Sequence, residues 1–315
     1  MIQMDQAIST DNPENSNNID DKNIITSFDN LAPNEVGSSW HVFSLLSWII
    51  FISALFNLLF GIQNGLKIDT PLYIDHTLVT IFLLVINIMG LIWTIKRTIY
   101  DKDQGFMNVF FGEQIKQQAF GFLFGAGAII SLRSIFDYVK MVDDLLEIKS
   151  RKSYYETYET YFDFAYSLLG INLSLSIIGY SCLIYSYSKI KQQSEWYEIM
   201  IIKKGAYSAS IGFLFYSMCF SSVILGLLNN SDIRGVSVSF TIIVSFFNIV
   251  YSFSQKDIGI AITNLIINIS LSSVYCYFGK TVYKAEMIIS LCFMSITFIL
   301  ILYLIFSMRD KIINA

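Results

Sequence analysis

Charged residues, proline, cysteine and histidine are all scarce in this sequence, and each scarcity excludes something. Only 15% of the residues are charged, whereas about a quarter are charged in an average soluble domain. The 3 prolines are Pro13, Pro33 and Pro71, so proline-broken helices, a feature of many transporters, are not predicted beyond that point. The 4 cysteines lie inside apolar runs at spacings that match no metal motif, which predicts thiols packed between helices.

Histidine and the short motifs of known enzyme classes are also lacking. The 2 histidines, His41 and His76, begin the first and second predicted spans and so lie on opposite sides of the membrane, where they cannot share a metal or a haem. No H-E-x-x-H, G-x-S-x-G, Walker A or C-x-x-C motif occurs. We therefore expect no metal and no cofactor, and the lack of a basic stripe argues against nucleic-acid binding.

What the sequence has instead is a series of long stretches without Asp, Glu, Lys or Arg. A helix needs roughly 20 mostly apolar residues to cross a bilayer core of about 30 Å. The sequence therefore predicts an all-α integral membrane protein, a bundle of about eight transmembrane helices in the lipid bilayer, compatible with four sequential hairpins. The predicted spans are about 41–61, 77–96, 119–139, 163–187, 205–228, 236–254, 258–278 and 286–307.

Three regions follow from this pattern. Residues 1–40 hold seven acids and one base among Asn, Asp and Ser, which predicts a disordered acidic tail that cannot bury a core. Residues 41–307 form the polytopic transmembrane domain, and residues 308–315 form a short tail. Between the third and fourth spans, Tyr154, Tyr158 and Tyr161 recur at helical spacing, which predicts that the fourth span continues outward as an amphipathic helix.

The orientation follows from the basic residues in the connections. Eight spans leave both termini on one side, and that side holds twelve Lys and Arg residues against eight on the other. Because basic residues concentrate on the cytoplasmic side, we expect both termini to be cytoplasmic. Trp40, Trp93 and Trp196 all map to the same interface, where indole rings prefer to lie. The sequence does not indicate which cellular membrane is involved.

Arg133 is the one charge well inside a predicted span. An arginine near the bilayer centre costs at least about 2.5–3.5 kcal/mol on insertion scales. Asp137 lies four residues further on, on the same helical face. The pair is a candidate contact with a substrate or ion, and the alternative is a self-neutralised pair that reaches outward to the interface.

Asparagine recurs inside the spans, and each amide group needs a partner in hydrocarbon. Asn264 and Asn268 share one face of the seventh span, as Asn172 and Ser176 do on the fourth. We regard Asn172, Asn264 and Asn268 as candidate residues of a polar pathway. The alternative is that asparagine bonds helix to helix in a chain that is rich in Asn, Ser and Tyr throughout.

Small residues open the third span. Gly121, Gly125 and Gly127 have the spacing that lets two helix backbones approach closely. Such a face packs inside the bundle or binds a membrane partner or a second copy of the chain. A weak echo links 91–97 with 183–189 and 121–125 with 212–216, at offsets of 92 and 91 residues, and either duplication or a biased apolar composition explains it.

Three functions therefore remain open. The first is a small transporter or channel-like protein with a polar path near Arg133. The second is a non-transporting membrane scaffold or assembly factor, in which the polar residues only join helices. The third is a lipid-modifying enzyme, which needs several acids at one membrane face, for example Glu113, Glu195 and Glu198.

Overall fold

The computed structural model describes residues 38–62, 76–100, 114–148, 155–188, 204–228, 233–278 and 284–313. These residues form eight helices. Residues 1–37 of the predicted acidic tail lie outside them, and residues 38–40, also predicted as tail, begin the first helix. The helices are α2 (Ser38–Ile62), α3 (His76–Tyr100), α5 (Gln114–Ile148), α6 (Tyr155–Ser188), α8 (Lys204–Leu228), α9 (Ile233–Gln255), α10 (Ile258–Phe278) and α11 (Lys284–Ile313).

Each described helix overlaps one predicted span, so the prediction of an all-α fold is confirmed for the residues that the structure describes. Seven of the helices contain a stretch that is long and apolar enough to cross a membrane. The eighth, α3, has a shorter apolar stretch at Thr77–Ile92, because Lys96 and Arg97 follow within its last turns. The residues predicted as a tail after 307 continue the last helix, since α11 runs to Ile313.

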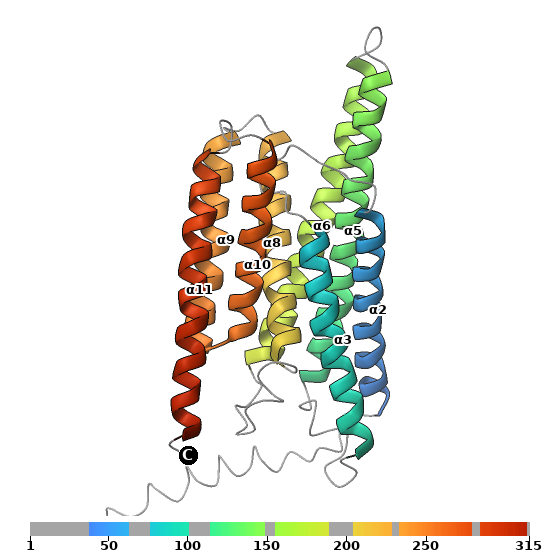
Figure 1. Ribbon diagram of the computed structural model, residues 1–315. Coiled ribbons are helices and arrows are strands. Elements are labelled where there is room, and N and C mark those ends of the chain that lie inside the picture. Colours follow the sequence, from blue (N-terminus) through green and yellow to red (C-terminus); the bar gives the residue numbers. More distant parts are fainter. Residues whose placement is uncertain are drawn as a thin grey trace, which may run out of the picture. The chain divides into compact units, whose positions relative to one another are not determined.

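Helix α8 lies at the centre of the arrangement (Figure 1). It contacts α3, α5, α6, α9 and α10, and 72% of its apolar stretch is buried inside the protein, against 22% for α11. The peripheral helices expose large apolar side chains along their outer faces, among them Phe60 of α2 and Ile299 of α11. An apolar exterior of this extent suits contact with lipid rather than with water.

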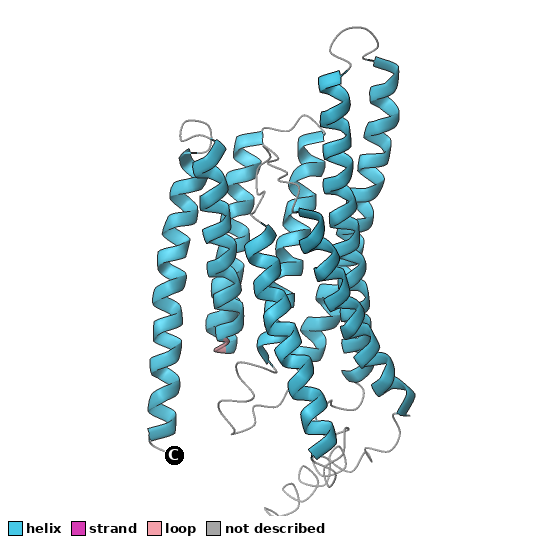
Figure 2. Ribbon diagram, turned by 45° about the vertical axis from the view of Figure 1, so that its right-hand side comes forward, coloured by secondary structure: helices cyan, strands magenta, loops and turns pink. Residues whose placement is uncertain are grey.

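The α5–α6 hairpin is longer than a membrane is thick. The two helices have 35 and 34 residues, or about 50 Å each at the helical rise of about 1.5 Å per residue. Their joined ends project beyond the ends of the other helices (Figure 1 and Figure 2). Because α6 begins at Tyr155, the predicted helical extension before the fourth span is confirmed, and it includes Tyr158 and Tyr161.

A tight turn joins α9 to α10. Lys256 has a φ of 51°, the left-handed conformation that often ends a helix. Asp257 then caps α10, because its Oδ1 accepts a hydrogen bond from the backbone N–H of Ile260 at 3.2 Å. Its other carboxylate oxygen accepts a hydrogen bond from the hydroxyl of Tyr187 at the end of α6. This buried aspartate ties the ends of α6 and α9 to the start of α10.

Candidate functional site

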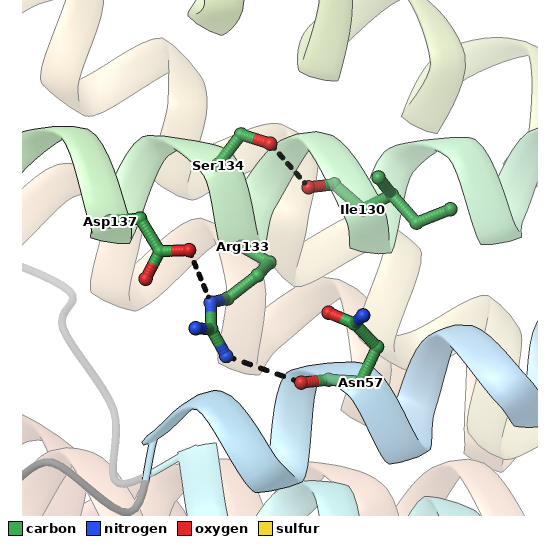
Figure 3. Close-up of polar contacts among 5 residues, drawn as sticks. All are labelled: Asn57, Ile130, Arg133, Ser134 and Asp137. Atoms are coloured by element: carbon green, nitrogen blue, oxygen red, sulfur yellow. Dashed lines mark hydrogen bonds and ion pairs between the residues drawn. The ribbon is translucent and has the colours of Figure 1, made fainter.

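Arg133 lies near the end of its apolar stretch, which closes at Asp137. Its Nε donates a hydrogen bond to Oδ2 of Asp137 at 2.7 Å, and its Nη1 donates to the backbone oxygen of Asn57 in α2 at 3.2 Å (Figure 3). The Arg133 side chain is 22% exposed and that of Asp137 is 53% exposed. The charge of Arg133 is thus balanced locally, by an acid on its own helix and a carbonyl on α2.

Neutralising this pair should change stability little. We expect Asp137→Asn to lower the free energy of unfolding by less than about 1 kcal/mol, because ion pairs with one well-exposed partner contribute little. The hydrogen bond from Arg133 to the Asn57 carbonyl remains in the variant. Reversible unfolding in mixed micelles measures the change, and a loss of several kcal/mol would contradict this account of the pair.

Asn172 joins three helices. Its Nδ2 donates to the backbone oxygen of Ala128 at 2.7 Å and to the hydroxyl of Ser131 at 3.0 Å, both on α5. Its Oδ1 accepts hydrogen bonds from Ser217, at 3.1 Å, and from Ser221, both on α8. The residue is fully buried, and four hydrogen bonds satisfy its amide. It therefore bonds α6 to α5 on one side and to α8 on the other.

A second amide joins the neighbouring helices in the same way. Asn87 of α3 accepts a hydrogen bond from the indole N–H of Trp48 in α2 at 3.0 Å. Its Nδ2 donates to the backbone oxygen of Leu83 at 2.9 Å and to the hydroxyl of Ser210 in α8 at 3.3 Å. Trp48 also stacks on Phe122 of α5, with ring centroids 5.0 Å apart. This cluster fixes α2, α3 and α8 together.

A third cluster connects the last three helices. Asn264 of α10 donates to the hydroxyl of Thr297 in α11 at 2.9 Å, and its Oδ1 accepts a hydrogen bond from Asn268 at 3.3 Å. Asn248 of α9 donates to the same oxygen at 3.5 Å. The Oδ1 of Asn268 accepts a hydrogen bond from Ser245 of α9 at 3.0 Å. These amides are buried and are partners of one another.

The predicted pathway residues therefore fall into separate groups. Asn264 and Asn268 belong to one cluster, Asn172 belongs to another, and Arg133 with Asp137 forms a third group near the end of its span. Among the hydrogen bonds and ion pairs of the described residues, none connects one of these groups to another. Each group satisfies its own polar atoms between neighbouring helices.

The glycines of α5 lie at helix crossings. A Cβ placed on Gly179 of α6 would lie 2.9 Å from the backbone nitrogen of Gly125, and one on Gly121 would lie 2.7 Å from Leu183 of α6. A Cβ on Gly125 would meet Phe51 of α2 at 3.0 Å, and one on Gly127 would meet the side chain of Leu175 in α6 at 3.1 Å. Within the chain, α2 and α6 therefore cover this face of α5.

The partners of the asparagines were not among the sequence candidates. Ser210, Ser217 and Ser221 are fully or almost fully buried on α8. Their spacing of seven and then four residues places them on one helical face. That spacing is a signal present in the sequence, but serine is so frequent in this chain that the pattern does not stand out.

Comparisons of the chain with protein-family models, with curated proteins and with solved structures found no match.

Proposed function

We propose that this protein is a multi-pass integral membrane protein that acts as a non-transporting scaffold or assembly factor. The observation that carries the proposal is the local pairing of its buried polar groups. The amides of Asn87, Asn172 and Asn264 each bond neighbouring helices inside a separate cluster, which is the role expected of asparagine as an interhelical bond. A transport path needs such groups to converge on one hydrated space.

The projecting α5–α6 hairpin is the element on which we place partner binding. Its two helices extend past the other helix ends (Figure 2), and the sequence from 138 to 163 is rich in acids, bases and tyrosine. Charged and aromatic residues suit a polar surface outside the lipid. With both termini cytoplasmic, as the basic residues of the connections favour, this hairpin points away from the cytoplasm.

The transport and enzyme hypotheses have less support. Arg133 and Asp137 bond each other and α2, and neither is a partner of the asparagine clusters. The acids suggested for a lipid-modifying enzyme, Glu113, Glu195 and Glu198, lie outside the described residues. We therefore retain the scaffold as the function to be tested first.

Cysteine accessibility in membranes tests the proposal. The 4 native cysteines are replaced by alanine, single cysteines are introduced, and a small water-soluble thiol reagent is applied from each side. The positions are Ile129, Arg133, Asn172, Asn264, Asn268 and Gln255. We expect Arg133 to react because it lies near the end of its apolar stretch, and the exposed Gln255 to react because it ends α9. The other four should be protected, because they are buried at 2% exposure or less.

Gln255 is the positive control, since it ends α9 beside the exposed turn residue Lys256. Reaction at Asn172, Asn264 and Asn268 from one or both sides would reveal a water-filled path and contradict the scaffold in favour of transport. Protection at these positions together with reaction at Gln255 supports a dry bundle.

A further inference from the structure

Helices α3 and α9 share a sequence pattern and a burial pattern. The pattern Thr-Ile-x5-Asn-Ile begins at Thr80 in α3 and again at Thr241 in α9, 161 residues later. The burial of residues 80–89 matches that of residues 241–250, position by position, with one exception. Each pair is buried, half-buried or exposed alike, except that Phe82 is half-buried and its counterpart Ile243 is exposed. Chance matches in apolar sequence do not require the same faces to be buried, and each helix also packs on the helix before it, α3 on α2 and α9 on α8. Their other partners differ, because α9 packs on α10 and α11, whereas α3 packs on α8 and α10.

Helices α5 and α10 are related in the same way. The pattern Ile-Ser-Leu-x-Ser begins at Ile130 in α5 and at Ile269 in α10, 139 residues later. The exposed positions Ile130 and Asp137 have exposed counterparts, Ile269 and Cys276. At this offset ten of the thirteen buried positions of α5 have buried counterparts: 118, 121, 122, 125, 128, 129, 131, 132, 135 and 136. The other three, Ile115, Ala119 and Ala126, correspond to half-buried or exposed residues.

Helices α5 and α10 each form a hairpin with the next helix, α6 and α11, and the two helices of each hairpin contact each other at corresponding residues. α5 and α6 come closest where the Cβ position of Gly179 lies 2.9 Å from the nitrogen of Gly125. The counterpart of Gly125 in α10 is Asn264, and it bonds Thr297 of α11 at 2.9 Å. Thr297 lies 118 residues after Gly179. At the same offset Leu183, which packs on Gly121, corresponds to Ile301 of α11.

The packing of Ile301 agrees with this pairing of positions. At the offset of 139 residues, Gly121 corresponds to Ile260, and Ile301 packs in one cluster with the next residue, Ala261. The first helices of the two sets, α2 and α8, also pack at corresponding places on α5 and α10. A Cβ placed on Gly125 of α5 would lie 3.0 Å from Phe51 of α2. The counterpart of Phe51, 161 residues later, is Gly212 of α8, and a Cβ placed there would lie 3.1 Å from Thr263 of α10, one residue before the counterpart of Gly125.

One face of α8 differs from the corresponding face of α2 in both residue type and burial. On α8, the buried Ser210 accepts a hydrogen bond from Nδ2 of Asn87, and the buried Ser217 donates one to Oδ1 of Asn172. The residues of α2 that correspond to Ser210, Ser217 and Ser221 are apolar and exposed. They are Ile49, Phe56 and Phe60, with exposed fractions of 44%, 39% and 63%. The same helix face thus meets lipid in one half of the protein and hydrogen-bonding partners in the other.

We propose that the eight described helices are two copies of one four-helix unit, α2–α3–α5–α6 and α8–α9–α10–α11, joined as a fused pair. The serine face of α8 is the surface through which the second copy binds the first. Its partners in the first copy are α3 and α6, which carry Asn87 and Asn172 and each pack on α8. Four spans separate equivalent helices, so both copies have the same orientation. The inference does not rest on the proposed scaffold function.

Cleavage between the copies tests this surface in the full chain. A protease site is inserted in the connection 189–203, and the protein is cut in detergent micelles and passed over a column that binds a C-terminal tag. We expect the N-terminal copy to be retained with the C-terminal copy. Ser217→Phe, which gives α8 the residue of α2, should release the N-terminal copy, because a ring cannot occupy the place of a hydroxyl that bonds Asn172.

Phe56→Ser is the matched control, since it makes the reverse exchange at an exposed position, and its copies should stay together. Release of the N-terminal copy from the cut protein without a substitution would overturn the proposal. Retention in cut Ser217→Phe to the same extent would overturn it as well.

A hydrogen bond between the last two helices of the first copy is missing from the second, which gives a second test that needs no cleavage. Asn172 and Ser131 are bonded in the first copy. Their counterparts, Ser290 and Ser270, are buried and their hydroxyls have no partner among the described residues. Ser290→Asn should therefore restore the bond and raise the unfolding temperature by roughly 2–4 °C, whereas Ser290→Leu should not. An unfolding temperature of Ser290→Asn at or below that of Ser290→Leu would overturn the correspondence.

Discussion

Gly179→Ala should be among the most damaging single substitutions in the protein. The added Cβ would lie 2.9 Å from the backbone nitrogen of Gly125 and 3.3 Å from the backbone oxygen of Gly121. Backbone atoms cannot turn away as a side chain can, so α5 and α6 have to move apart. We expect a loss of about 2–3 kcal/mol in the free energy of unfolding, the upper range of overpacking costs.

Gly170→Ala is the matched control on the same helix. A Cβ at Gly170 would meet nothing within 4 Å, and alanine favours helix by about 1 kcal/mol over glycine. The two substitutions should therefore change stability in opposite directions, as measured by reversible unfolding in mixed micelles. Equal effects at Gly179 and Gly170 would contradict the close crossing of α5 and α6.

Asn172→Leu should produce the second large loss. The substitution removes four hydrogen bonds, and the hydroxyl of Ser221 loses its acceptor, whereas that of Ser131 still donates to the backbone oxygen of Ala128. Hydrogen bonds between transmembrane helices contribute about 0.6 kcal/mol each on average, so we expect a loss of roughly 2 kcal/mol. The same unfolding measurement determines it.

Asn57→Leu is the control for this exchange. Asn57 is exposed on α2, and only its backbone oxygen is used, by Arg133 (Figure 3). The side chain takes part in no hydrogen bond with the described residues, so its replacement should leave stability within about 0.5 kcal/mol. A loss at Asn57 as large as that at Asn172 would mean that these losses reflect the change of side-chain type and not the hydrogen bonds.

The helices could be predicted from sequence because the hydrocarbon core imposes a length. About 20 residues without charge identify a span whatever its neighbours are, and every described helix overlaps its predicted range. The residues at which the helices end could not be predicted in this way. α3 continues to Tyr100 and α11 to Ile313, past charged residues that lie beyond the apolar stretch.

The faces of the helices could not be predicted in the same way. In a soluble protein, polar residues mark the outside and apolar residues the core. Here both the lipid-facing and the buried positions are apolar, as Phe60 and Leu55 on α2 illustrate, so periodicity does not separate them. The inward faces are marked by small and polar residues instead, such as Ser47 of α2, Asn87 of α3 and Gly179 of α6.

The grouping of the candidate residues also depended on the three-dimensional arrangement. Arg133 and Asp137 could be paired from their spacing of four residues. Nothing in the sequence related Asn172 to Ser217, 45 residues away, or Asn87 to Ser210, 123 residues away. These pairings follow from the central position of α8, which depends on how all of the helices pack.

We propose that the buried polar groups of this bundle are bonded across helices and do not line a hydrated space. Cysteines at Asn172 and Ser217, in a chain without native cysteine, test it most directly. In intact membranes under mild oxidation we predict a disulfide between α6 and α8, and no reaction of either thiol with a water-soluble reagent beforehand. Reaction of both thiols with the reagent, without a disulfide on oxidation, would contradict the account.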